Sequence, residues 1–419
     1  MANSPVTPQW VINEVARQFL NRVILIKKAD RTYDKQFMGV GARARDGQKV
    51  GSIVNARLPH RYRVGSGAAI NKQSVNDQTT PVEITDQTNI GIELSSWTMS
   101  LEVNEIRKKI IQPAVNALVQ DMEYKGFQRL YQKIPNSIGT LGTSPSTNLT
   151  YTQGVAKLLD LTGNTDDLTA IVSGDQMAVI ADTQKAYFNQ PVQKETFRTG
   201  QMPKATEALG IAEWYASPNV ALHTSGTLTT STPLVNVAGG VLDGATSVVV
   251  DGGNAADVWE VGDVFTFADV YEVNSSNYQS TGRLRQFTVT SRATGATPTI
   301  NFTPAVRYSA NGQYNNVNAL PADNAAISLW GTAGGGSLAS TTSRQGLIFA
   351  PDSFIFAMAD AEDVDAPVCV FARDEEAGIS LRLTKSYDIN NDNNLARIDA
   401  FWGWSGMRLE WTALRVQGD

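Results

Sequence analysis

The sequence is poor in the residues that most often carry out chemistry. Among its 419 residues are one cysteine, Cys369, and two histidines, His60 and His223, which lie far apart in the chain. A single cysteine excludes an intrachain disulfide, and zinc sites need clusters of cysteine and histidine. The chain contains no HExxH, GxSxG or phosphate-binding glycine motif. We therefore expect no catalytic residue, no cofactor and no metal, and we expect that the protein is not an enzyme.

Charge and long apolar runs are also scarce. Charged residues make up only 18% of the chain, and the formal net charge is -6. A protein that binds duplex DNA through its surface shows a clustered basic face, which this composition does not indicate. No apolar stretch approaches the roughly 20 residues that cross a bilayer, and no secretory signal is visible after Met1, so no membrane partner is expected. Few charges suit a chain whose surface is largely covered by other subunits.

Asp388 begins a pattern that resembles a calcium loop. Position 12 of such a loop would be Asp399, where these loops have a glutamate that binds through both oxygens. Position 6 would be Asn393, where glycine is needed for the turn. We interpret the pattern as a polar hairpin turn.

A long helix is the most regular feature that is present. Apolar residues recur three or four apart between Ser100 and Pro135, which places them along one helix face. Pro113 has no backbone N–H and a fixed φ, so it belongs in the first turn of a helix. We predict a short leading helix over Asn104–Ile111 and a main helix over Pro113–Ile134, roughly 33 Å long.

A second amphipathic helix is predicted over Trp10–Val23. Its apolar residues, Phe19 among them, share one face, and Thr7 and Pro8 supply the chemistry of a helix start. The next forty residues offer no second helix to pack against it. We interpret it as an arm that contacts a neighbouring subunit through side chains including Trp10 and Phe19, although it also fits the first helix of a compact domain.

Strand patterns follow the arm. We expect Gly47–Leu58 to pair with Arg61–Val64 around Pro59, followed by a polar loop that projects from the molecule. Arg57, Arg61 and Arg63 bring like charges together in this hairpin, and such charges repel unless acidic groups face them. We predict that the partner is an acidic patch on another copy, and the candidate residues are Asp360, Glu362, Asp363 and Asp365.

The middle of the chain has a different composition. Residues 221–340 contain no lysine, four arginines, six aspartates and two glutamates. Short Val, Phe and Thr runs alternate there with turn residues, which predicts a small all-β barrel or sandwich. Polar linkers at Thr224–Thr232 and Gly331–Gly336 indicate an insertion. Helices and strands on both sides predict a split α+β domain, whose last strands are expected to complete the sheet begun near Leu168.

The fold class is therefore α+β, and the chain divides into five parts. They are an N-terminal arm (1–46), an extended hairpin loop with peripheral strands (47–100), a long helix with the first part of the α+β domain (101–220), an inserted β domain (221–336) and the second part of the α+β domain (337–419).

The order of these parts resembles that of the major coat proteins of tailed phages with the Hong Kong 97 fold. Within them it is similar to the short-tailed phage group whose coat protein carries an inserted β domain. The segments that carry the resemblance are Asn13–Asp34, Gly47–Val64, Ile110–Lys133, Gly346–Met358 and Gly378–Trp404. The insert departs from that group in its very low charge, which leaves open whether it forms salt bridges.

The resemblance implies a major capsid protein that self-assembles, as hexamers and pentamers, into an icosahedral shell enclosing a double-stranded DNA genome. Its further implied partners are a scaffolding protein, a portal protein and packaged DNA, the last through non-specific contact at the inner surface. The protein would be made in the host cytoplasm and reside in the virion.

Two other classes of protein stay open. The β-rich middle, with its many Ser, Thr and Gly residues, also fits a surface or tail adhesin. Carboxylates such as Asp363 and Asp374 fit an enzyme acting on polysaccharides, if two of them are held roughly 5–10 Å apart across a cleft.

Overall fold

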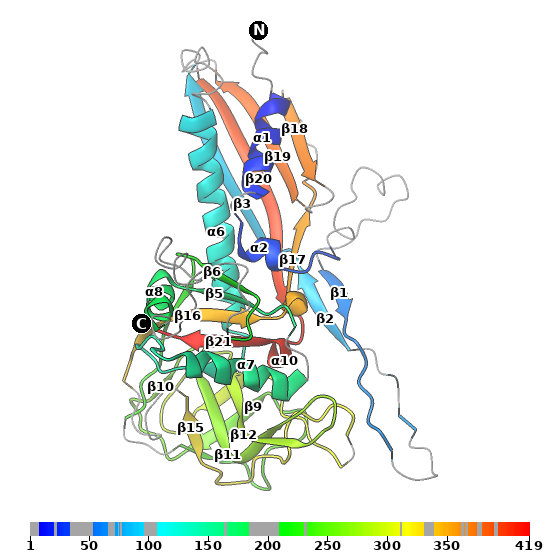
Figure 1. Cartoon of the computed structure of the whole chain (residues 1–419), viewed down its shortest axis with the longest axis vertical. Coiled ribbons are helices and arrows are strands. Elements are labelled where there is room, and N and C mark those ends of the chain that lie inside the picture. The colour runs from blue at the N-terminus through cyan, green and yellow to red at the C-terminus, as the bar shows by residue number, and fades with distance from the viewer. Residues whose placement is uncertain are drawn as a thin grey trace. The chain divides into compact units, whose positions relative to one another are not determined.

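The computed structural model (Figure 1) describes residues 8–20, 23–33, 53–65, 72–73, 75, 78–95, 107–162, 166–183, 209–229, 233–310, 312–330, 339–361, 364, 368–374, 379–388 and 393–419. The chain divides into two compact units. Unit 1 contains Met1–Arg57, Thr79–Gly126 and Phe354–Met407, and unit 2 contains Leu58–Gln78, Phe127–Ser353 and Arg408–Asp419. The predicted linker Gly331–Gly336 lies outside the described residues.

The main element of unit 1 is an antiparallel sheet. Its strands are β3 (Asp86–Ser95), β17 (Phe354–Ala359), β18 (Val368–Asp374), β19 (Ile379–Asp388) and β20 (Asn393–Gly406). β20 pairs with β3 along one edge and with β17 and β19 along the other, and β19 pairs with β18. These strands form a sheet of their own, so the expectation that all the C-terminal strands complete the sheet begun near Leu168 is wrong.

Helix α1 (Pro8–Leu20) packs against β18 and β19 of the same chain (Figure 1). Its apolar face is buried there, with Phe19 at 0% exposure. Helix α1 thus has a packing partner within its own chain, and contact of this segment with a neighbouring subunit stays a prediction. The partner strands lie near the other end of the sequence, where a search along the neighbouring residues does not find them.

A carboxylate holds the segment that follows α1. Glu123 is buried on the long helix α6 (Gln112–Tyr131) and accepts hydrogen bonds from the backbone N–H groups of Ile24 and Leu25. Asp30 then forms a parallel bridge with Ile355 of β17. The N-terminal segment is thus tied to both the helix and the sheet of unit 1.

The predicted long helix is confirmed. A π-helical turn, η3 (Arg107–Ile111), leads into α6, and Pro113 is the second residue of the α-helix, where no N–H is required. The helix ends at Tyr131, and the next residues continue as turns in which Lys133 and Ile134 donate to Leu130 and Tyr131. The sequence therefore predicts the C-terminal end of the helix, at Ile134, a few residues too late.

Strand β1 (Ile53–Arg57) pairs with β2 (Thr79–Glu83), with Arg57 opposite Thr79. The predicted pairing of Gly47–Leu58 with Arg61–Val64 is wrong, because residues 58–65 form no strand. The burial of apolar side chains explains why β1 pairs with β2. Val54, Ala56 and Val82 turn to one side and pack against the apolar side chains of β17.

Unit 2 contains a mixed α/β layer. Its elements are β4 (Ser137–Ile138), α7 (Asn148–Thr162), β5 (Thr169–Val172), α8 (Gly174–Thr183), β6 (Glu213–Ala216), β7 (Ala221–Thr224), β16 (Thr342–Phe349), α10 (Leu409–Thr412) and β21 (Ala413–Gln417). The strand order is β4-β21-β16-β5-β6, with β7 also paired to β16. The helix α10 comes directly before the last strand, β21.

Residues 225–341, here named the middle β segment, leave and rejoin this layer at one place. Thr224 of β7 lies opposite Thr342 of β16 in an antiparallel pair, and their hydroxyl oxygens are 2.9 Å apart. The chain therefore enters and leaves the middle β segment through neighbouring strands.

The middle β segment folds around an aromatic core. Its larger sheet has the order β15-β11-β12-β14-β9-β8, and β10 pairs with β13. The strands are β8 (Leu234–Val235), β9 (Ser247–Asp251), β10 (Val258–Trp259), β11 (Val264–Val273), β12 (Ser280–Val289), β13 (Ala293–Thr294), β14 (Thr299–Thr303) and β15 (Ile327–Leu329). Phe265, Phe267, Phe287 and Phe302 pack with ring centroids 5.3–6.0 Å apart. The predicted strands of this region are confirmed.

No helix in the described part of the chain is both long and apolar enough to cross a membrane.

Gly126 supports a close contact inside unit 1. A Cβ added there would lie 2.7 Å from Cε2 of the Trp404 ring, whose indole N–H donates to the carbonyl of Met122 at 3.3 Å. We predict that Gly126→Ala lowers the free energy of unfolding by about 1–3 kcal/mol through overpacking. This loss exceeds the gain of up to about 1 kcal/mol that alanine brings to a helix interior.

Chemical denaturation of the purified chain measures this effect. Gly174→Ala is the matched control, because an added Cβ there meets nothing within 4 Å. We expect the control to unfold at the native denaturant concentration or slightly above it. A stabilised Gly126→Ala protein would contradict the packing argument.

Candidate functional site

Several charged residues of the middle β segment lie where it contacts the rest of unit 2. Glu272 lies 3.9 Å from Lys157, and both side chains are buried. The fully buried Arg285 is 3.0 Å from Glu410 of α10. The low charge of this segment therefore does not remove its salt bridges, a point that the sequence left open. We name this interface within unit 2 the polar contact. It contains Lys157, Glu272, Arg285, Glu410 and the polar side chains of β12 and β21 that contact them or their neighbours.

Strand β12 brings polar side chains to this contact by its alternation. Phe287 belongs to the aromatic core, whereas Gln286 and Thr288 point away from it. The Gln286 amide donates to the carbonyl of Ser137 at 3.1 Å and accepts from the N–H of Ser137 at 2.8 Å. The Thr288 hydroxyl donates to the carbonyl of Ile134 at 3.0 Å. β12 is thus bonded to the turn that follows α6.

Arg415 of β21 contacts the same polar face of β12. Its guanidinium donates to the carbonyl of Gly262 at 2.9 Å and to the hydroxyl of Thr288 at 3.3 Å, and it lies 5.8 Å from the ring centroid of Tyr131. Complete burial lowers the pKa of Arg415 to about 10. These bonds are what allow a cation to lie inside the unit.

A histidine and an aspartate close the entry to the middle β segment. His223 Nε2 is 2.9 Å from Asp263 Oδ1, and both side chains are buried. Asp263 also accepts from the N–H groups of Gly226 and Glu260. Gly226 is required, because a Cβ would lie 2.0 Å from the carbonyl oxygen of Val258.

Arg61 lies against the polar contact within its own chain. Its guanidinium donates to the carbonyl of Ser275 at 3.0 Å and lies 4.3 Å from the ring centroid of Trp411 and 5.5 Å from that of Tyr278. Desolvation lowers the pKa of Arg61. The side-chain amide of Gln313 donates to the Arg61 carbonyl.

Arg61 therefore has contacts within its own chain, and its predicted contact with an acidic patch of another copy stays a prediction. Its partners, Ser275, Tyr278 and Trp411, lie more than two hundred residues away in the sequence, and no local pattern indicates them. Arg63 shares the Tyr278 ring at 5.5 Å, and Arg57 is exposed on β1. Contacts of Arg57 and Arg63 with a neighbouring copy stay predictions.

The other predicted contact residues are placed as follows. Phe19 is buried within unit 1, so it offers no surface to a neighbour in this structure, and Trp10 is half-buried. Asp360 is half-buried just after β17. Glu362, Asp363 and Asp365 lie outside the described residues, and nothing places them.

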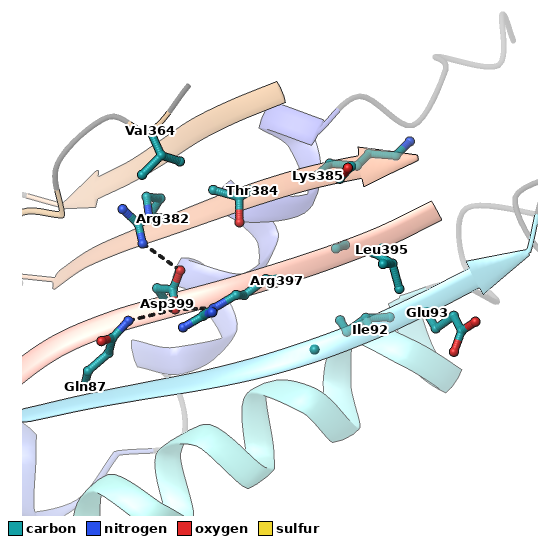
Figure 2. A pocket seen from close by; sticks show the side chains of 13 residues that line it. Gln87, Ile92, Glu93, Val364, Arg382, Thr384, Lys385, Leu395, Arg397 and Asp399 are labelled. Carbon is teal, nitrogen blue, oxygen red and sulfur yellow. Dashed lines mark hydrogen bonds and ion pairs between the residues drawn. The ribbon is translucent and has the colours of Figure 1, made fainter. Parts of the chain in front are cut away.

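The calcium pattern is also resolved in part. Asp399 is buried between Arg382 and Arg397, at 2.9 and 2.7 Å (Figure 2). Both oxygens of the carboxylate at position 12 of the calcium-loop pattern are therefore paired with arginine side chains. Across the described ranges, no group of three or more His, Cys, Asp or Glu residues is arranged to hold a metal ion.

Solved structures similar to this chain include phage capsids and a coat-protein domain. The capsid of Ralstonia phage GP4 is 7% identical with a TM-score of 0.44, over 94% of this chain and 87% of that chain. A structure from Mycobacterium phage Che8 is 8% identical with a TM-score of 0.40, over 94% and 91%. The CUS-3 coat protein I-domain is 28% identical with a TM-score of 0.18, over 26% of this chain and 96% of that domain.

Sequence comparison gives the family. The model described as P22 coat protein, gene protein 5, matches residues 1–414. The protein is therefore a phage capsid protein, a structural component of the virion. Within that class the chain belongs to the P22 coat protein family, and it forms the shell by assembling with copies of itself. No curated protein matches the sequence.

We predict that Arg61→Ala lowers the stability of the unassembled chain by about 1–3 kcal/mol. The variant loses a cation–π contact and a charge-assisted hydrogen bond, and it leaves the Trp411 face uncovered. Thermal melting of the purified monomer measures the change. Arg57→Ala, on the exposed edge of β1, is the control and should melt within about 0.5 kcal/mol of the native chain. Equal melting of the two variants would show that the Trp411 contact contributes nothing.

We predict that the stability contributed by Lys157 depends on pH. Burial lowers the pKa of Lys157 from 10.5 to about 8. Between these values the unfolded chain binds a proton that the folded chain does not, so the contribution to unfolding free energy rises with pH. It is least favourable below pH 8, where the folded protein carries a buried charge.

Comparison with Lys157→Met isolates this effect, because the other titratable groups contribute the same pH dependence to the unfolding free energy of both proteins. The native unfolding free energy should rise relative to that of the variant by up to about 3 kcal/mol between pH 8 and 10.5. Denaturant unfolding at several pH values in this range measures the difference. A difference that stays constant over the range would contradict the assignment.

Proposed function

We propose that the protein has the Hong Kong 97 fold and builds an icosahedral shell of hexamers and pentamers around a double-stranded DNA genome. The observation that carries this proposal is the match of the P22 coat protein family to residues 1–414. The long helix α6, the split mixed layer of unit 2 and the low content of charged residues support it.

Residues 221–336 are, in this proposal, a β domain inserted into the α+β domain. Two observations support it: β7 and β16 are paired neighbours at the two ends of the segment, and the segment has its own aromatic core. The polar contact then holds the insert on the parent domain, with Glu272 and Arg285 as its charged anchors. The remaining parts are the arm (1–46), the extended loop (47–100) and the two pieces of the parent domain (101–220 and 337–419).

Neighbouring copies meet, in this proposal, through surfaces that include Trp10, Arg57 and Arg63 on one side. The acidic residues opposite them are Asp360, Glu362, Asp363 and Asp365. Assembly uses a scaffolding protein and a portal protein, and packaged DNA contacts the inner surface without sequence specificity. The chain acts as a structural subunit and not as an enzyme, in keeping with its poverty in histidine and cysteine.

Negative-stain electron microscopy of the purified chain, expressed with and without a scaffolding protein, tests the proposal. We expect closed particles of uniform diameter with the scaffold present, and incomplete or irregular particles without it. Fibres would favour an adhesin. Monomers under every condition would contradict the shell and favour the alternative of an enzyme acting on polysaccharides.

A further inference from the structure

A lysine and a carboxamide meet inside unit 2, between helix α7 and strand β12. The side-chain nitrogen of Lys157 donates a hydrogen bond to Oε1 of Gln286, and both side chains are buried. The carbonyl carbon of a carboxamide lies one C=O bond, about 1.2 Å, from that oxygen. The nitrogen of Lys157 is therefore held beside the carbon atom that an amine attacks when it forms an amide.

The same lysine loses its proton at an unusually low pH. Burial lowers the pKa of Lys157 from 10.5 to about 8; Arg285 and Arg283 add to this effect, and Glu272 opposes it. The neutral amine is the nucleophilic form of a lysine, and desolvation favours that form. At pH 8 about half of the folded chains therefore have a nucleophile in contact with the Gln286 carboxamide.

The carboxamide is held in one orientation by the backbone of Ser137. Its Oε1 accepts from the N–H of Ser137 at 2.8 Å, and its Nε2 donates to the carbonyl of Ser137 at 3.1 Å. Attack on the carboxamide carbon moves negative charge onto Oε1, and a donor that already points at this atom stabilises that charge. The N–H of Ser137 is thus placed as an oxyanion donor.

A carboxylate with a spare oxygen lies beside the amine. Glu272 is fully buried, and its Oε1 accepts from the hydroxyl of Thr281 at 3.0 Å. Its Oε2 has no hydrogen-bond partner among the described residues and is 3.9 Å from Nζ of Lys157. A carboxylate in this place can take the proton that the attacking nitrogen releases and pass it to the leaving nitrogen.

We propose that Lys157 and Gln286 join through an isopeptide bond, which links the middle β segment covalently to helix α7. The neutral amine attacks Cδ of Gln286, a C–N bond forms, and the negative charge on Oε1 is met by the N–H of Ser137. Glu272 takes a proton from the attacking nitrogen and delivers it to Nε2, whose bond to Cδ breaks. Ammonia leaves with both electrons of that bond, so the reaction needs no oxidant or reductant.

The bond changes the stability of unit 2 and not its function. It closes a covalent loop between α7 and β12, which restricts the unfolded chain much as a disulfide does. The reaction occurs once, on the chain's own residues, so the protein is still a structural subunit without turnover. The pH dependence of unfolding expected for Lys157 belongs to the unlinked chain, in which the amine still titrates.

Mass spectrometry of the purified full-length chain tests the proposal. We expect an intact mass that is lower by one ammonia, and a protease digest that contains a branched peptide joining Lys157 to Gln286. Any fraction that is still unlinked should react roughly tenfold faster at pH 9 than at pH 7, because the neutral fraction of this amine rises by that factor. A chain that keeps its full mass at pH 9, or that loses ammonia without giving the branched peptide, would overturn the proposal.

Two variants test the role of the carboxylate. Glu272→Gln keeps the size of the side chain and removes the proton acceptor, so we expect it to link at least roughly tenfold more slowly. Lys125→Met removes a half-exposed lysine of α6 and is the control, which should link at the native rate. Linking of Glu272→Gln at the native rate would overturn the assignment of Glu272. Circular dichroism shows whether this variant folds, and if it does not, the branched peptide of the native chain decides.

Discussion

Strand β12 presents two chemically different faces, and the organisation of unit 2 depends on this difference. Phe287 turns into the aromatic core of the middle β segment, and the neighbouring Gln286 and Thr288 turn to the turn after α6 and to Arg415. The apolar face supplies most of the stability, since a fully buried phenylalanine contributes about 1.5–3 kcal/mol. The polar face adds little net stability, because desolvation of buried charges offsets most of their attraction. Its effect is to fix the register.

A shift of β12 by one residue would cost a large amount of stability, so its register is strongly fixed. It would turn Phe287 toward Ser137 and Arg415, and it would move Gln286 and Thr288 into the aromatic core without hydrogen-bond partners. Each buried polar group without a partner costs about 1–3 kcal/mol. The buried pair of Lys157 and Glu272 adds to this restriction, since it can form in only one position of the segment. A segment with few charges can therefore still have a charged contact. A few charges in fixed positions are enough to define one way in which the segment packs on the rest of unit 2.

The sequence predicts well those elements whose signal is local. The apolar stripe of α6, with Pro113 in its first turn, and the short strands of the middle β segment both follow from periodicity over about ten residues. It does not predict partners that are distant in the chain. The pairing of β1 with β2 skips the extended loop, α1 packs on strands from the other end of the sequence, and Arg61 finds its aromatic partner at Trp411. A single sequence contains no pattern that links such residues.

Glycines show the same limit of a single sequence. Gly126 and Gly91 look alike in the sequence, since each interrupts a regular element. The structure separates them, because the space that a side chain would occupy at Gly126 is filled by Trp404, whereas the space at Gly91 is empty in the single chain. The first glycine serves the packing of its own chain. The second is not required by packing among the described residues of its own chain, and only the position of a distant residue such as Trp404 reveals this difference.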